Sequence, residues 1–237
     1  MFNFFLCWGV FFILTPSEFT KQDIIKTLHI PKEKIIVTCL APTYLGIKYT
    51  NEEIKIKYNI KKPYLLYVGV AYPHKNLNRL IQAWKIFEKD NNNFNLVLVG
   101  KKNYFYENLI NSKEYQNCKN IIFTDFVPDN ELSTLYQNAK AYIFPSLYEG
   151  FGLPPLEAMQ YNIPVISSDT TCLPEILGNS AFYFDPQNEY DIFSKISIIL
   201  NDDNKRQELI NNIPNILAKY SQNNTSKNTL LVYQKMV

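Results

Sequence analysis

The 237-residue chain is poor in glycine, cysteine and histidine, and neither sign of charge is in large excess. Its four cysteines form no C-x-x-C pair, and with only two histidines they cannot complete a zinc-binding pattern. They are also too few for a disulfide scaffold, so we interpret them as reduced, which predicts a cytoplasmic protein. The 24 basic and 22 acidic residues leave a net charge of +2, which does not favour nucleic acid as the main partner.

Long apolar runs are rare as well, and the one that stands out is Phe4–Leu14. A helix of this length would cross roughly half of a bilayer core, about 16 Å. The run has neither a basic leading segment nor a small-residue cleavage site, so it is a poor signal peptide. We interpret residues 1–14 as a buried strand. The alternative that stays open is a weak membrane-associating segment, which would limit any membrane contact to a peripheral one.

The segment after this run combines one helix signal with a short strand and a polar stretch. Ser17 is a plausible N-cap, and the apolar residues that follow are spaced for a helix that ends before Pro31. Ile35–Cys39 is apolar and predicts a short strand. Ala41–Lys62 is polar and broken by proline and glycine, and we interpret it as a connection between two structural units.

From residue 64 onward, apolar strands alternate with amphipathic helices. Strands are predicted at Tyr64–Val68, Asn95–Val99, Asn120–Thr124, Ala141–Phe144, Pro164–Ser167 and Ala181–Phe184. Helices are predicted at 77–87, 104–115, 129–139, 152–161 and 192–200. Strands that are apolar throughout are typical of a parallel sheet covered on both faces. The sequence therefore predicts an α/β, Rossmann-like fold, which binds its ligands at the carboxyl ends of the strands.

The few glycines fall where such a fold would bind a ligand. Gly69 and Gly100 directly follow predicted strands, and Gly150 and Gly152 stand together before a helix that starts near Leu153. Glycine allows a tight turn or the close approach of a ligand. Two prolines occupy the first turn of this helix, where their missing N–H groups cost nothing. The remaining free N–H groups and the helix dipole suit an anion such as a diphosphate.

Charged residues accompany both strand–loop–helix junctions. Glu149 precedes the glycine pair, and Glu157 lies about one turn into the helix, where its carboxylate can accept both hydroxyls of a ribose. Lys75 lies in the loop after Gly69 and can meet a phosphate as a point charge. Each has a plainer alternative, since Lys75 can be a solvated loop residue and Glu157 an exposed helix residue.

Glu149 and Glu157 in this setting resemble the E-x7-E motif of retaining GT-B glycosyltransferases of the family 4 type. Residues 162–168, Leu173–Gly178 and Phe184–Pro186 resemble the later markers of that family. Pro73–Asn76 resembles the Pro-Arg-Lys-Asn loop of mannosyltransferase-like members. The resemblance extends from about Thr15 to a closing helix that contains Leu230–Tyr233. The E-x7-E pair alone is a weak signal. The chain is identified as a member because all the motifs from Pro145 to Pro186 occur in the order usual for the family.

The resemblance implies a protein with two Rossmann-like domains that face a cleft. Residues 1–45 would be a remnant of the N-terminal domain and its connection, 46–220 the donor-binding domain, and 221–237 the C-terminal closing helix. It implies transfer of a hexose with retention to a glycan or lipid-linked acceptor, without metal or other cofactor. The donor would be a GDP- or UDP-sugar, with GDP-mannose favoured.

The resemblance also assigns residues. Lys75 and Glu149 would be catalytic, with Lys75 neutralising the diphosphate and Glu149 meeting the donor sugar. The donor-binding set would be Gly69, His74, Lys75, Val127, Glu149, Gly150, Phe151, Gly152, Leu153 and Glu157. His74 replaces the arginine usual in the family, and we expect it to pack rather than to catalyse. Asp125 and Glu175 are expected to be structural.

Family members have a full domain before the position that matches Thr15, whereas 14 residues precede it in this sequence. Whether the chain is active by itself therefore stays open. The chain can be the donor half of a split enzyme whose partner chain supplies the other domain. It can be a truncated protein that binds the donor without turnover, or a minimal transferase. A non-catalytic nucleotide-sugar-binding protein is the alternative from another class, and a sugar-nucleotide epimerase fits the motif poorly.

Overall fold

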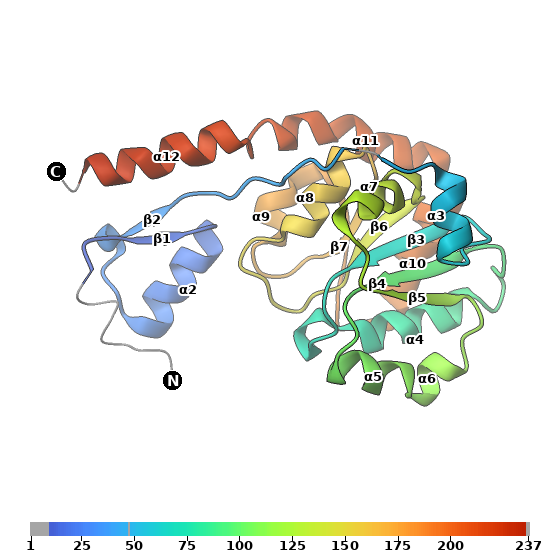
Figure 1. Ribbon diagram of the computed structural model, residues 1–237. Coiled ribbons are helices and arrows are strands. Elements are labelled where there is room, and N and C mark those ends of the chain that lie inside the picture. Colours follow the sequence, from blue (N-terminus) through green and yellow to red (C-terminus); the bar gives the residue numbers. More distant parts are fainter. Residues whose placement is uncertain (1–9, 47, 236–237) are drawn as a thin grey trace.

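The predicted strands form one parallel sheet in the computed structural model, which describes residues 10–46 and 48–235 (Figure 1). Its strand order is β5-β4-β3-β6-β7-β8. The bounds are β3 (Tyr64–Val68), β4 (Asn95–Val99), β5 (Ile121–Asp125), β6 (Ala141–Phe144), β7 (Val165–Ser168) and β8 (Ala181–Phe184). Strands β4, β6 and β7 are buried along their whole length, because helices cover both faces. The predicted α/β fold is confirmed.

Helices α4, α5 and α6 lie on one face of the sheet, and α7 and α8 on the other (Figure 1). The bounds of the helices are α4 (Leu77–Phe87), α5 (Tyr104–Ile110), α6 (Lys113–Gln116), α7 (Asp129–Asn138), α8 (Leu153–Gln160), α9 (Leu173–Leu177), α10 (Glu189–Asn201) and α11 (Asp203–Leu217). The single helix predicted over 104–115 is wrong. Ser112 interrupts it by accepting a hydrogen bond from the Tyr115 N–H, which starts α6 as a separate turn.

A small N-terminal unit precedes this domain. Its strands β1 (Ile13–Thr15) and β2 (Ile35–Val37) pair in parallel, and α2 (Glu18–Leu28) connects them. Ser17 caps α2 as predicted, since its side chain accepts from the Thr20 N–H. In the described part of the predicted buried strand over residues 1–14, a strand does form from Ile13, but it is not buried as expected, since Phe11 is 74% and Leu14 41% exposed. Residues 1–9 of that prediction lie outside the described residues.

The segment predicted as a plain connection contains a helix, α3 (Asn51–Lys57). Thr50 and Glu53 form a capping box at its start, and Ile54 is buried beneath it. The helix is held to α7 because Glu131 accepts hydrogen bonds from the Lys57 ammonium at 2.7 Å and the Tyr58 hydroxyl at 2.6 Å. This helix has only two apolar residues, so the apolar spacing used to predict helices does not detect it.

The C-terminal helix α12 (Gln222–Gln234) extends from α11 across the N-terminal unit (Figure 1). Thr225 donates a hydrogen bond to the Cys39 carbonyl at 2.9 Å, and Val232 is buried. Both ends of the described chain are thereby joined in one unit. Among the helices of the described residues, we find none with the length and hydropathy that a bilayer crossing requires.

Candidate functional site

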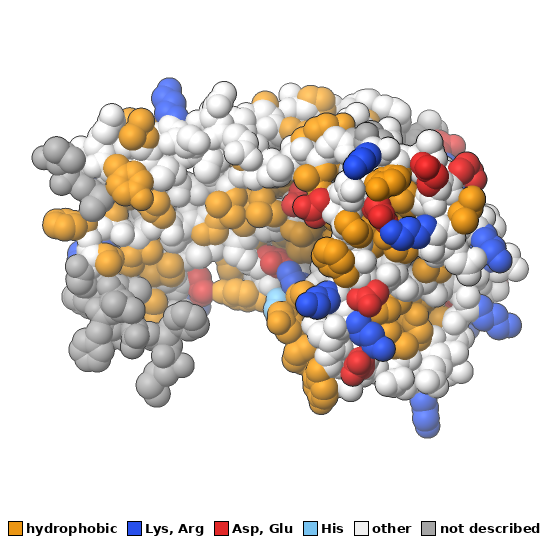
Figure 2. Space-filling view, viewed as in Figure 1, with side chains coloured by type: hydrophobic (Ala, Val, Ile, Leu, Met, Phe, Trp, Pro, Cys, Tyr) orange, Lys and Arg blue, Asp and Glu red, His pale blue; other side chains and the backbone are white. Residues whose placement is uncertain are grey.

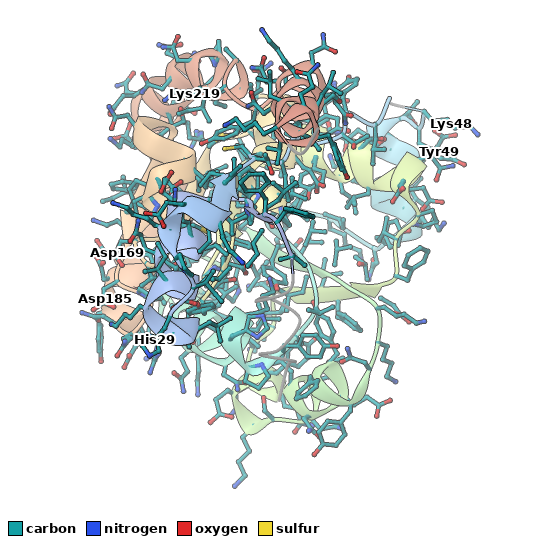
Figure 3. All side chains as sticks on the ribbon, turned by 90° about the vertical axis from the view of Figure 1, so that its left-hand side faces the viewer. His29, Lys48, Tyr49, Asp169, Asp185 and Lys219 are labelled. Atoms are coloured by element: carbon teal, nitrogen blue, oxygen red, sulfur yellow. The ribbon has the colours of Figure 1, made fainter. Side chains whose placement is uncertain are left out.

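The carboxyl ends of the sheet strands face the N-terminal unit. Asp169 and Asp185, which directly follow β7 and β8, lie on the same margin of the molecule as His29 at the end of α2 (Figure 3). Figure 2 shows the surface hollowed between the N-terminal unit and the larger domain, with basic and acidic side chains at the edge of the hollow. This is the edge at which open parallel sheets bind ligands.

The loop between β6 and α8 is held in place by hydrogen bonds to the last residue of β7 and to the residues that follow this strand. The Ser168 hydroxyl donates to the Ser146 carbonyl at 2.6 Å. The Glu149 N–H donates to the Thr171 hydroxyl at 3.3 Å, and the Cys172 thiol donates to the Glu149 carbonyl at 3.2 Å. Three hydrogen bonds therefore hold the backbone of the loop, and none of them uses the carboxylate of Glu149.

Gly152 turns this loop into α8. Its φ of 91° is a left-handed conformation that glycine adopts without strain, and an added Cβ would lie 2.8 Å from a methyl carbon of Leu173. Leu153 is the first residue of α8, and no side chain caps the helix. The next two residues are prolines without an N–H, so the Leu153 N–H and the helix dipole are what this end offers to an anion. Gly150 and Phe151 complete the loop, and the Phe151 ring packs edge-on against Tyr220.

The second loop, between β3 and α4, is joined to the first. Pro73–Lys75 form one turn of 3-10 helix, followed by Asn76 in a left-handed conformation with φ of 60°. Asn76 is buried, and its amide donates to the carbonyls of Pro145 at 3.1 Å and Pro186 at 2.8 Å. The Leu147 N–H donates to the His74 carbonyl at 2.7 Å. Asn76 thus positions the loop, a role that the sequence analysis did not assign.

These contacts bring Lys75 against Glu149. The Lys75 Nζ lies 2.5 Å from the Glu149 Oε1, and the two side chains are only 15% and 14% exposed. The ammonium also lies 5.3 Å from the centre of the Phe144 ring. His74 was expected to pack rather than to catalyse, and its ring does lie 6.0 Å from that of Tyr72, on the exposed surface of the loop. The structure thus places one cation and one carboxylate beside the open end of α8.

Glu157 occupies the predicted place on α8, where it is partly buried. Its Oε2 accepts a hydrogen bond from the Tyr136 hydroxyl at 3.2 Å. Burial raises the pKa of the Glu157 carboxyl, because the ionised form loses hydration and the hydrogen bond from Tyr136 only partly compensates. Within the described residues no cation pairs with Glu157. Its carboxylate is suited to accept hydrogen bonds from hydroxyl groups.

A separate hollow of about 350 Å³ lies past the ends of β4 and β5. Lys101, Lys102, Asp125 and Phe126 line it, and Val127 is buried beside them. The Asp125 carboxylate accepts from the N–H groups of Lys102 and Phe126, which agrees with a structural role for this acid. Next to this hollow, Gly100 allows the backbone after β4 to approach the backbone after β3, since a Cβ on Gly100 would lie 2.0 Å from the Gly69 carbonyl oxygen.

The N-terminal unit contacts the glycine loop directly, which the sequence analysis did not predict. The Gly150 carbonyl accepts hydrogen bonds from the Ser17 hydroxyl at 2.7 Å and the Thr20 hydroxyl at 3.1 Å. The Glu175 carboxylate accepts from the first two N–H groups of α2, at 2.8 and 3.0 Å. Glu175 is therefore structural as expected, but it stabilises the distant α2.

Comparison with known proteins agrees with this architecture. The chain matches the family model described as "Glycosyl transferases group 1" over residues 50–216, and it belongs to this family. It is 34% identical over 201 residues to O-antigen chain mannosyltransferase B of Escherichia coli, covering 82% of this chain and 53% of that protein. It is 33% identical over 213 residues to O-antigen chain mannosyltransferase RfbU of Salmonella typhimurium, covering 90% of this chain and 56% of that protein.

Solved structures support the fold. Sucrose-phosphate synthase from Thermosynechococcus elongatus superposes with a TM-score of 0.78 at 21% identity, over 94% of this chain and 57% of that one. At this identity the likeness concerns the fold alone. The chain spans about half the length of the curated relatives it matches. The resemblance to GT-B glycosyltransferases noted in the sequence is confirmed.

Proposed function

We propose that this chain binds a nucleotide-sugar donor at the joined loops and serves the transfer of its hexosyl group to a glycan or lipid-linked acceptor. The observation behind the proposal is the contact between Lys75 and Glu149 beside the open N-terminus of α8. The names of the O-antigen mannosyltransferases favour mannose as the hexose and GDP-mannose as the donor, with UDP-sugars next.

The diphosphate of the donor would lie between Lys75 and the N-terminus of α8. Lys75 supplies a positive charge, and the helix end supplies the Leu153 N–H and the positive end of the helix dipole, since the next two residues are prolines. Both stabilise the negative charge that builds on the diphosphate as it leaves, which is the main electrostatic task in this reaction. With this charge supplied by Lys75 and the helix end, we propose that transfer needs no metal.

The transfer itself breaks the bond between the anomeric carbon and the diphosphate oxygen. A bond from the acceptor hydroxyl forms on the same face of the sugar, so the configuration is retained. The hydroxyl proton passes to the departing diphosphate. Glu149 is held beside the sugar by its backbone contacts, where its carboxylate can orient a sugar hydroxyl.

The nucleoside would extend from this point toward α7. Glu157 accepts the two ribose hydroxyls, for which its carboxylate is suited, because Tyr136 compensates its burial only in part. The base enters the hollow at Phe126, whose ring is 64% exposed. Aromatic faces of this kind stack on nucleobases.

The test is a transfer assay with the purified full chain. GDP-mannose and UDP-glucose are offered with a lipid-linked glycan fraction, and released nucleoside diphosphate and product anomer are measured with and without EDTA. We expect GDP release with an α-linked product that EDTA does not reduce, and loss of product in Lys75→Ala. Lys227→Ala, on the exposed surface of α12, is the matched control. Donor binding without any transfer would favour the non-catalytic binding protein instead.

A further inference from the structure

A second concave surface lies on the other side of the Pro73–Lys75 turn, between α4, α5 and α6. We call it the aromatic groove and define it by Tyr72, Asn78, Gln82, Phe105, Asn108 and Glu114. Its volume is about 490 Å³, within the range of about 300–1,000 Å³ usual for small-molecule sites. The donor site described above uses none of these residues.

Aromatic rings form one wall of the groove. Tyr72 is 44% exposed, and its ring stands edge-on to Phe105 with the centres 5.1 Å apart. Tyr104, 70% exposed, does not line the groove, but its ring lies 5.5 Å from that of Phe105. The negative face of an aromatic ring attracts polarised C–H groups, which a sugar ring presents on its flat side. Adjoining rings that reach the surface at a hollow are a feature of ligand-binding grooves.

Side-chain amides form the facing wall. Asn78 and Gln82 are four residues apart on α4 and therefore share one helix face, and Asn108 faces them from α5. In the part of the chain that the structure describes, none of these three amides has a hydrogen-bond partner on the protein. An amide both donates and accepts hydrogen bonds, as a sugar hydroxyl does. The wall is thus equipped for a ligand rich in hydroxyl groups.

The charged residues that line the groove distinguish between a phosphate-containing ligand and a neutral one. Its described lining holds no lysine or arginine, and Glu114 is its charged residue. A phosphate or nucleotide would find no cation there and would meet a carboxylate, which disfavours it. Rings and free amides without cations fit a neutral sugar, so we propose that the aromatic groove binds a saccharide chain, as a glycan subsite next to the donor loop.

The test measures binding of α-linked mannotetraose to the full chain by calorimetry, with cellotetraose as the second probe. The choice of mannose rests on the proposed function, whereas the groove itself does not. We expect saturable binding that Tyr72→Ala weakens about tenfold or more, while Tyr72→Phe keeps the ring and stays within about twofold of wild type. Tyr190→Ala removes a ring on α10 that is 65% exposed and does not line the groove, and it should change nothing.

The donor site provides an independent readout. Tyr72→Ala should leave GDP and UDP binding unchanged, and Lys75→Ala should leave saccharide binding unchanged, so the two proposals can fail separately. Binding of cellotetraose alone, lost in Tyr72→Ala, would support the groove and replace mannose by glucose. The proposal is overturned if neither tetrasaccharide binds, if Tyr72→Ala binds as well as wild type, or if GDP displaces the saccharide.

Discussion

Lys75 and Glu149 lie 74 residues apart in the sequence, yet the ammonium and the carboxylate meet at 2.5 Å. They reach this contact because each follows a strand of the same parallel sheet, β3 and β6, and these strands are neighbours. Asn76 and the Leu147 N–H then join the two loops. A donor diphosphate would therefore enter a site whose charges are already in place, which lowers the cost of reorganisation on binding.

The first prediction concerns this lysine. Lys75→Met keeps the aliphatic stem and removes the charge. Loss of one charge-assisted hydrogen bond, about 1.5–3 kcal/mol, should weaken GDP and UDP binding about 10–100-fold. Guanosine and uridine, which have no phosphate, should bind within about twofold of wild type, with Lys227→Met as the control. Equal weakening of nucleoside and nucleotide by calorimetry would contradict the assignment of Lys75 to the diphosphate.

The second prediction follows from the raised pKa of Glu157. Its native pKa lies above the ordinary 4.5, so the native state binds this proton more tightly than the unfolded state does. The associated stability is present below pH 4.5 and is lost as pH rises through the raised pKa. Glu157→Gln avoids the buried charge and keeps an acceptor for Tyr136. It should melt at a higher temperature than wild type at pH 8, with the gain vanishing toward pH 4.5.

Glu208→Gln is the matched control for this measurement. Glu208 lies on α11, where its side chain is 60% exposed and paired with Lys205. Its substitution should show no comparable gain at pH 8. If Glu157→Gln melts below wild type at that pH, the carboxylate is not under the desolvation cost described here.

The third prediction concerns Gly152. An alanine here takes a left-handed conformation and places its Cβ 2.8 Å from Leu173. We expect Gly152→Ala to lower the free energy of unfolding by about 1–3 kcal/mol in urea titrations. Gly46→Ala is the control, because nothing lies within 4 Å of its added Cβ. Equal stability of the two variants would contradict the role given to Gly152 in starting α8.

The fourth prediction concerns the contact between the N-terminal unit and the domain. Glu175→Ala removes the acceptor of two N–H groups of α2, a loss comparable to that of a helix cap, about 0.5–2 kcal/mol. Hydrogen exchange should quicken along α2 and remain unchanged in β3 and β4. Glu33→Ala, at an exposed site in the same unit, should leave both unchanged. Unaltered exchange of α2 in Glu175→Ala would contradict this contact.

The sequence predicted the sheet well because its strands are almost uniformly apolar. Five residues at Tyr64–Val68 and five at Asn95–Val99 match the observed strands in full, since buried parallel strands leave little choice of residue. Helix α3 was missed because its surface is polar. Its start was nevertheless readable, since Thr50 and Glu53 have the spacing of a capping box.

The candidate site could be predicted in its parts but not in its contacts. Glycines after strands and carboxylates near a helix start are local patterns, so Gly152 and Glu157 stood out. The hydrogen bonds from Ser17 and Thr20 to Gly150 join residues more than a hundred positions apart. Nothing in the local sequence encodes them, since they depend on how the N-terminal unit packs on the loop. The aromatic groove likewise arises from three helices that no single motif describes.

The central claim is that the joined loops bind a nucleoside diphosphate through Lys75 and Glu157. Calorimetric titration of the full chain with GDP, UDP and their sugar conjugates tests it most directly, with Glu157→Ala measured alongside. We predict that one nucleotide series binds with micromolar affinity, about −8 kcal/mol, and that Glu157→Ala weakens it at least about tenfold. The account would be contradicted if no nucleotide binds, or if Glu157→Ala binds it as tightly as wild type.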